Sequence, residues 1–446
     1  VGPAQPYVLA EADGPGGATE PTGKPALPPP VPRAQLARAW PRFRGLGGAG
    51  HWPEKDLPLD WDLETGRNVL WKAEVPLPGM SSPVTWDGRV YLTGAIRDRH
   101  DMFCFDAADG TLLWRTRIQP RGSAGEPEDV WAQTGLAAPT PCTDGRAVYA
   151  LFANGDLAAV GLDGKVLWSQ ALGAPNNPYG HATSLLTYGG RLLVQMDQAP
   201  PGASALLAFD GATGKERWRI PRPVRGSWAT PIIAPTERGD QLVTLGNPWA
   251  IAYDPTDGRE LWRVQCVGPD AAPSPVYGAG LVFAAAPNRQ LTAIRPTGTG
   301  DVTGTDKIVW TADADLPTIV SPLCDGSTTG SPQDGPRLYT LTTEDPLLVC
   351  YEAATGRDLW FQAYDGLKFD SSPTLVGGRI LLLARDGTAV VLAPGEAYRE
   401  LSRSKLGERC HASPAFLPGR MFLRGAKHLF CIGPAKPAGH AGDGAP

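Results

Sequence analysis

Short apolar runs bounded by turn residues recur along the whole chain. The run Val90-Tyr91-Leu92 follows Gly88-Arg89, and the run Ile380-Leu381-Leu382 follows Gly378-Arg379. Runs of this length next to glycine-containing turns are typical of β-strands. The chain also holds 54 glycines and 46 prolines, which suits many short strands joined by tight turns. The pattern therefore predicts an all-β protein.

Each predicted inner strand begins after a small residue, which in most repeats precedes a proline. Thr183-Ser184 occupies this place in the third repeat without its proline. The other seven starts are Ser82-Pro83, Thr140-Pro141, Thr230-Pro231, Ser274-Pro275, Ser321-Pro322, Ser372-Pro373 and Ser413-Pro414. Eight starts predict eight innermost strands.

A tryptophan closes seven of the repeats, at the end of a turn-and-strand motif whose clearest copy is DGATGKERW at residues 210–218. These tryptophans recur at intervals of 43 to 54 residues and are Trp71, Trp114, Trp168, Trp218, Trp262, Trp310 and Trp360. Self-similarity at such a long period indicates propellers or solenoids. Together with the eight starts, this spacing predicts an eight-bladed β-propeller with four antiparallel strands per blade.

The two ends of the repeat array predict how the ring closes. The start at Ser413 is followed by enough chain for only three strands, whereas the apolar strand at residues 69–75 has no strands of its own before it. We expect this N-terminal strand to join the last blade, because closure removes the two sheet edges that an open array would expose. One propeller then occupies residues 40–433.

The flanking segments have a different composition. Residues 1–39 are rich in Pro, Gly and Ala, and are expected to form a disordered tether, with residues 434–446 as a flexible tail. The chain begins at Val1 and not at Met, which is consistent with a removed leader and leaves a lipid anchor open. No apolar run approaches the roughly 20 residues that span a bilayer, so no transmembrane segment is expected.

Charge and cysteine content narrow the possible partners and cofactors. A net charge of −5 without a basic stripe argues against a nucleic-acid partner. The seven cysteines form no C-x-x-C pair, no haem-attachment motif and no adjacent Cys-Cys pair. We interpret them mainly as core thiols.

Several quoted segments together resemble a known family. The tryptophan motif, Trp40-Pro41-Arg42-Phe43-Arg44-Gly45, Tyr179-Gly180-His181-Ala182, Gly300-Asp301-Val302-Thr303 and the C-terminal segment from Gly407 to Gly433 are similar to PQQ-like (BamB-like) propellers of the planctomycete type. The resemblance implies that the seven motif tryptophans pack between neighbouring blades as structural residues. It leaves the function open, because relatives include both quinoprotein dehydrogenases and outer-membrane assembly scaffolds.

The residues just before each inner strand should gather around one mouth of the central channel, which makes them a natural ligand site. In chain order they are Met80, Thr134, His181, Trp228, Asp270, Thr318, Asp370 and His411, with Arg225, Lys368 and Arg409 close by.

Two kinds of chemistry are conceivable at this mouth. A quinone site could use Trp228 for the ring, Arg225 and Arg409 for its carboxylates, and Asp270 and Asp370 for Ca²⁺. A metal site could use His181 and His411 with a carboxylate. The other histidines are expected to be surface or core residues, His51, His100 and His440 in loops or the tail and His428 in a strand.

Two functions follow. The first is a non-enzymatic scaffold outside the cytoplasm, in the periplasm or beyond, that binds a protein partner and needs no cofactor. The alternative is a PQQ- or metal-dependent oxidoreductase with its site at the channel mouth.

Overall fold

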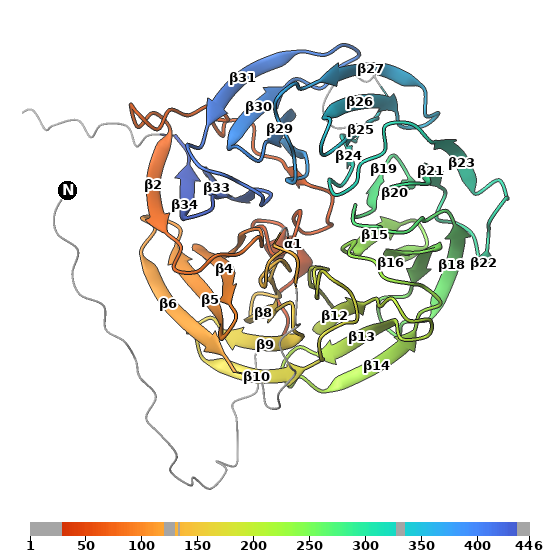
Figure 1. Cartoon of the computed structure of the whole chain (residues 1–446), viewed down its shortest axis with the longest axis horizontal. Helices are drawn as coiled ribbons and strands as arrows, with labels where there is room; N and C mark the ends of the chain where they lie inside the picture. Colours follow the sequence, from red (N-terminus) through yellow and green to blue (C-terminus); the bar gives the residue numbers. More distant parts are fainter. Residues whose placement is uncertain (1–28, 120–129, 133, 327–334, 435–446) are drawn as a thin grey trace, which may run out of the picture.

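The computed structural model describes residues 29–119, 130–132, 134–326 and 335–434. Eight sheets surround a central axis, and each contains four antiparallel strands (Figure 1). This arrangement confirms the predicted eight-bladed propeller. Two of the sheets carry one additional short parallel strand at an edge. Among the described residues, no helix has the length and apolar character needed to cross a membrane.

The first four blades follow the chain directly. Blade 1 contains β3 (Val84–Trp86), β4 (Arg89–Ile96), β5 (Arg99–Asp106) and β6 (Leu112–Ile118). Blade 2 contains β7 (Cys142–Thr143), β8 (Ala147–Leu151), β9 (Asp156–Gly161) and β10 (Val166–Ala171). Blade 3 contains β11 (Leu186–Tyr188), β12 (Arg191–Met196), β13 (Ala205–Asp210) and β14 (Glu216–Pro221). Blade 4 contains β15 (Ile232–Thr236), β16 (Gly239–Gly246), β17 (Trp249–Tyr253) and β18 (Glu260–Gln265), with β22 (Gly300–Asp301) added at its outer edge.

The remaining blades complete the circle. Blade 5 contains β19 (Val276–Gly278), β20 (Leu281–Ala286), β21 (Gln290–Ile294) and β23 (Ile308–Ala312). Blade 6 contains β24 (Leu323–Cys324), β25 (Arg337–Leu341), β26 (Leu347–Glu352) and β27 (Asp358–Ala363). Blade 7 contains β28 (Thr374–Val376), β29 (Arg379–Leu383), β30 (Thr388–Leu392) and β31 (Glu400–Lys405), with β1 (His51–Trp52) added beside β28. Blade 8 contains β32 (Ala415–Leu417), β33 (Arg420–Arg424), β34 (His428–Ile432) and β2 (Val69–Glu74).

Strand position within a blade explains the hydrophobic pattern. The middle strand β9 is buried at every residue, because blades pack against each other on both of its faces. The outer strand β27 has no buried residue and alternates between exposed and half-buried positions. The middle strands therefore appear in the sequence as continuous apolar runs, and the outer strands as partly polar ones.

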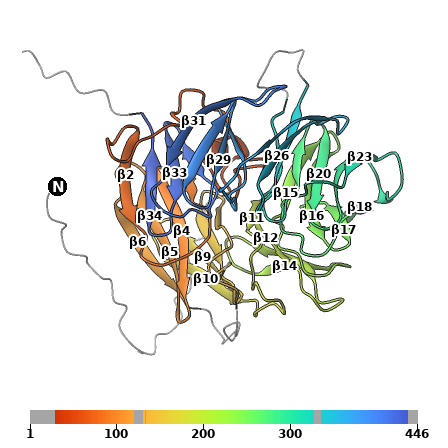
Figure 2. The same cartoon turned by 45° about the horizontal axis from the view of Figure 1, so that its top comes forward.

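The ring closes as the sequence predicts. Strand β2 pairs antiparallel with β34, from Val69 opposite Ile432 to Glu74 opposite His428. Figures 1 and 2 show β2, in orange, beside β34, in blue. Strand β2, which precedes blade 1 in the sequence, thus completes the last blade.

A closed circle of hydrogen bonds joins the eight residues that start the inner strands. The backbone N–H of each start residue donates to the side-chain hydroxyl of the corresponding residue in the next blade, at 3.0 to 3.1 Å. In order, this Ser/Thr ring runs through Ser82, Thr140, Ser184, Thr230, Ser274, Ser321, Ser372 and Ser413, and returns to Ser82. Ser184 belongs to the ring although no proline follows it.

The motif tryptophans lie at the outer part of the blade interfaces. Six of them donate the indole N–H to a backbone carbonyl of the next blade, at Ala107, Leu162, Gly211, Thr256, Ala353 and Gly395. Trp262 differs, because it donates to Gln241 Oε1 in its own blade. Trp168 lies over Gly214, where a Cβ atom would approach the indole to 2.6 Å, so the turn requires glycine.

The N-terminal segment crosses the centre of the ring before it reaches β2. Helix α1 (Arg33–Leu36) lies at the centre in Figure 1, and Arg33 forms an ion pair with Asp240 of blade 4. This corrects the expectation of a disordered tether up to residue 39, because Leu36 and Ala39 bury apolar side chains against the propeller. Residues 1–28 and 435–446 lie outside the described residues.

Residues 40–52, which we call the plug, contact the inner strands of several blades. The Trp40 carbonyl accepts from Thr85 of blade 1, and the Pro41 carbonyl accepts from Thr143 of blade 2. Further along the plug, β1 pairs parallel with β28 of blade 7. The plug thereby contacts the inner strands of blades 1, 2 and 7.

The Ser/Thr ring yields a stability prediction. Ser274→Ala removes the hydroxyl that accepts from the buried Thr230 N–H, and an unsatisfied buried donor costs about 1–3 kcal/mol. We expect a decrease of this size in the free energy of unfolding by urea. Ser274→Thr should retain stability, because Thr already serves at two ring positions, and Ser402→Ala on outer strand β31 is the control. An unfolding free energy of the Ala variant equal to that of the wild type would contradict a structural role for the ring.

Candidate functional site

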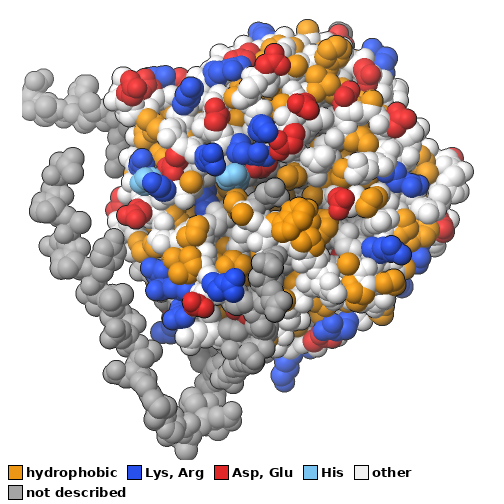
Figure 3. Space-filling model, viewed as in Figure 1, with side chains coloured by type: hydrophobic (Ala, Val, Ile, Leu, Met, Phe, Trp, Pro, Cys, Tyr) orange, Lys and Arg blue, Asp and Glu red, His pale blue; other side chains and the backbone are white. Residues whose placement is uncertain are grey.

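The mouth is the channel opening formed by the loops that precede the inner strands. Figure 3 shows acidic, basic and histidine side chains close together near the centre of this face, beside hydrophobic side chains. Two clusters can be defined there, one charged and one aromatic.

The charged cluster is a chain of ion pairs between blades 6, 7 and 8. Asp370 Oδ2 lies 2.7 Å from His411 Nδ1, and both Asp370 oxygens accept from Arg385, at 2.7 and 3.0 Å. Arg385 also contacts Glu344, which binds Lys368. Burial raises the pKa of Asp370, but the hydrogen bonds from His411 and Arg385 outweigh this and hold it below its usual value. Asp370 is therefore an ionised, fully engaged carboxylate at neutral pH.

The aromatic cluster consists of Trp131, Tyr179 and Trp228. The ring of Tyr179 lies edge to face with that of Trp228 at 4.6 Å, and with that of Trp131 at 5.0 Å. Trp131 is 50% exposed, which is unusual for so large an apolar side chain. The nearby Arg225 and Asp270 are both exposed. This half of the mouth offers aromatic surface bordered by single charges.

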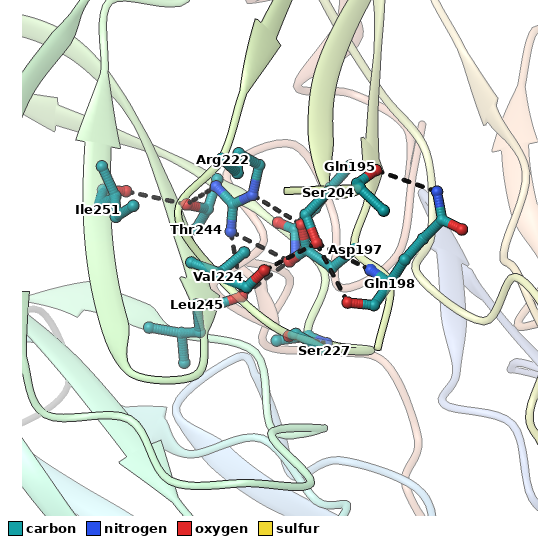
Figure 4. Close-up of polar contacts among 12 residues, drawn as sticks. Gln195, Asp197, Gln198, Ser204, Arg222, Val224, Ser227, Thr244, Leu245 and Ile251 are labelled. Carbon is teal, nitrogen blue, oxygen red and sulfur yellow. Dashed lines mark hydrogen bonds and ion pairs between the residues drawn. The ribbon is translucent and has the colours of Figure 1, made fainter. Parts of the chain in front are cut away.

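A buried ion pair holds the loop that carries Trp228 (Figure 4). Arg222 and Asp197 are both completely buried, with Arg222 Nε 2.7 Å from Asp197 Oδ1 and Nη2 3.1 Å from Oδ2. Ser204 Oγ fixes the Val224 carbonyl two residues further along. No sequence pattern predicts this pair, because neither residue belongs to a repeated motif. Its contacts order the backbone from Arg222 to Trp228.

His181 has a structural environment. It is buried, and its Nε2 lies 2.9 Å from the carbonyl of Gly173, which requires Nε2 to be the donor. Burial lowers the pKa of His181 to about 4, so the ring stays neutral. His411 is held by Asp370 instead, and within the described ranges no three His, Cys, Asp or Glu side chains lie together as a metal would require. The structure does not gather His181, His411 and a carboxylate into one ligand set.

The quinone and calcium candidates are also dispersed. Ca²⁺ takes six to eight oxygen ligands, but both oxygens of Asp370 already accept from the guanidinium group of Arg385, whose positive charge would repel a metal ion. Asp270 and Arg409 are exposed on loops of different blades. Trp228 is half-buried against Tyr179. The residues that were predicted to bind Ca²⁺ therefore do not fit this ion in their present arrangement.

The remaining mouth residues, Met80, Thr134 and Thr318, form hydrogen bonds with neighbouring loop residues. The Met80 N–H donates to the Ala137 carbonyl, the Thr134 N–H donates to the Trp131 carbonyl, and Thr318 Oγ1 donates to Thr343 Oγ1 at 2.9 Å. All three are positioned at the mouth as structural parts of the loops.

Two histidines that we expected in loops lie in strands. His51 is in β1, where its Nε2 contacts the Cys324 carbonyl at 2.6 Å, and His100 is in β5, 2.7 Å from Asp156. His440 lies outside the described residues. These contacts link residues that are distant in the sequence, and neither histidine belongs to the mouth.

The seven cysteines are all buried free thiols. Burial raises the pKa of six of them to about 12, namely Cys104, Cys266, Cys324, Cys350, Cys410 and Cys431, and raises that of Cys142 well above its usual value. Thiols in this state are poor nucleophiles at neutral pH.

The environment of His181 predicts a pH dependence of stability. Its folded pKa of about 4 lies below the unfolded value of about 6.5, so between these values only the unfolded chain takes up the proton. The contribution of this pKa difference to the free energy of unfolding is complete above pH 6.5. It falls by up to about 3 kcal/mol as the pH drops towards 4. His181→Gln, which keeps a donor for the Gly173 carbonyl, should flatten the wild-type slope in urea titrations at pH 4.5 to 7. Parallel slopes for both proteins would contradict this assignment.

Comparisons with known proteins agree with the propeller geometry. The chain is 27% identical over 296 residues to the serine/threonine-protein kinase AfsK of Streptomyces griseus, and 30% identical over 225 residues to the quinohemoprotein alcohol dehydrogenase ADH IIB of Pseudomonas putida. These matches cover 57% and 45% of this chain, and only 33% and 29% of those relatives. The chain thus spans about a third of the length of the curated relatives it matches.

Solved structures show the same fold. BamB from Moraxella catarrhalis aligns with a TM-score of 0.54 at 16% identity, over 81% of this chain and 98% of that one. Quinohemoprotein alcohol dehydrogenase from Comamonas testosteroni aligns with a TM-score of 0.63 at 14% identity, over 92% of this chain and 83% of that one. The family model described as outer membrane protein assembly factor BamB matches residues 55–194, 202–303 and 300–400, which is well over half of the chain. The chain therefore belongs to this BamB-type family of propellers.

Proposed function

We propose that this chain is a non-enzymatic scaffold outside the cytoplasm, in the periplasm or an equivalent compartment, that binds a protein partner of the cell envelope through the mouth face. Membership of the BamB-type family supports this role, and the motifs quoted above support a planctomycete-type subgroup. The single observation that carries the proposal is the aromatic cluster at the mouth. Its exposed Trp131 belongs to a residue type that is enriched at interaction hot spots.

The charged cluster supports the same function. Its groups are paired with each other, so it presents a fixed pattern of charge without needing a bound ion. Such patterns set partner specificity and association rate more than affinity. A rigid ring that displays aromatic and charged loops on one face is suited to a protein partner.

Substitution of one exposed aromatic side chain tests the scaffold function. A partner is first identified by cross-linking to the tagged protein in envelope extracts, and its Kd is then measured with purified components. Trp131→Ala should weaken binding at least tenfold, in line with the roughly 2 kcal/mol of a hot spot. Phe361→Ala is the matched control, because Phe361 is 72% exposed but lies on outer strand β27 at the side of the ring. Equal effects of the two substitutions, or none, would argue against the mouth as the binding face.

The likeness to quinohemoprotein alcohol dehydrogenases keeps a PQQ- or metal-dependent oxidoreductase as the alternative. Purified protein is incubated with PQQ and Ca²⁺, and a quinone absorbance band and dye reduction are measured. We expect neither. Dye reduction that is lost in Asp370→Asn would replace the scaffold function by the oxidoreductase.

A further inference from the structure

Two arginines of the plug are buried inside the channel. Arg42 is 4% exposed and Arg44 is 2% exposed. Arg42 Nη2 donates to the Pro231 carbonyl at 2.5 Å, and Arg44 Nη2 donates to the Pro322 carbonyl at 2.6 Å. These prolines directly follow two residues of the Ser/Thr ring, so both guanidinium groups enter the same channel next to the ring.

Neither arginine has an acidic partner among the described residues. The contacts of Arg42 are to a carbonyl and, at longer range, to the thiol Cys142, while Arg44 contacts the carbonyls of Pro322 and Ala49. Burial lowers the pKa of Arg42 to about 10 and that of Arg44 to about 9, since no carboxylate offsets the loss of water. Both groups still carry a positive charge at neutral pH. Buried charges in folded proteins are normally paired.

The buried polar atoms that lack a partner in this segment are all donors. They are Trp40 Nε1, Arg42 Nε, Arg44 Nε and Arg44 Nη1. Buried donors without an acceptor are rare in folded proteins. Carbonyl dipoles satisfy one nitrogen of each guanidinium group but leave its net charge in place. Since the unmatched groups are donors with two positive charges and no acid, the species that complements them is a negatively charged acceptor.

We propose that the plug binds a small inorganic anion beside the Ser/Thr ring, held by the unpaired N–H groups of Arg44, with the positive charge of Arg42 two residues away in the same segment. The anion fixes the plug to the Ser/Thr ring from inside. The site uses none of the residues of the charged and aromatic clusters, so it does not depend on the proposed scaffold function.

A bromide soak of wild-type crystals tests the site directly. We expect an anomalous difference peak within hydrogen-bond distance of Arg44 Nε or Nη1. Phosphate-grown crystals distinguish an oxyanion from a halide, because a tetrahedral peak that bromide does not displace would assign the site to an oxyanion. Bromide found only at exposed arginines, with water alone beside Arg44 in both crystals, would overturn the proposal.

Thermal unfolding in solution provides a second test. Chloride or phosphate replaces gluconate in the buffer at constant ionic strength. We expect this replacement to raise the wild-type Tm by about a few degrees. Arg44→Met should lose this rise, whereas Arg238→Met, which removes an exposed arginine between β15 and β16, should keep it. If Arg44→Met does not fold, Arg44→Lys takes its place, since it keeps the charge but loses the guanidinium donors. An equal rise in the wild type and the folded Arg44 variant would contradict a specific site.

Discussion

The geometry of this propeller depends on the circle of hydrogen bonds through its eight serine and threonine hydroxyls. Each bond links one blade to the next, and the circle closes only if there are eight blades in the correct order. The hydroxyl satisfies a buried backbone N–H at the innermost point of the ring, where the strands are too crowded for water to reach every donor. Proline after the start residue fixes the backbone there and carries no N–H that would need a partner.

The outer interfaces add a second level of contact. Most motif tryptophans donate to a carbonyl of the following blade and cover its turn glycine, so that each blade is fixed both at its inner and at its outer strand. Trp262 is the exception, and the chain compensates there with the parallel strand β22, which covers the outer edge of blade 4. With the blades held at both ends, the loops between them can vary without disturbing the ring. The charged and aromatic clusters of the mouth occupy such loops.

The sequence predicted the features that recur in each blade but missed the elements that occur only once. Small-residue starts and closing tryptophans recur eight and seven times, so blade number and closure could be read from spacing alone. Helix α1, the plug and β1 depend on single long-range contacts, such as that between Arg44 and Pro322, which no periodicity reveals. At the mouth, repeat position placed Asp370 and His411 correctly in the same region. Repeat position could not show that Arg385, in the turn after β29, would donate hydrogen bonds to both carboxylate oxygens of Asp370.

The pairing of β2 with β34 also constrains the order of events during synthesis. Strand β2 leaves the ribosome early, but its partner is among the last described residues to appear. Until then blade 8 lacks its outer strand, and β2 presents unpaired backbone groups of the kind that promote aggregation. Contacts between such distant residues also form slowly. The nascent chain therefore spends most of its elongation as an open arc, a state in which chaperone protection of a single strand would have the greatest effect.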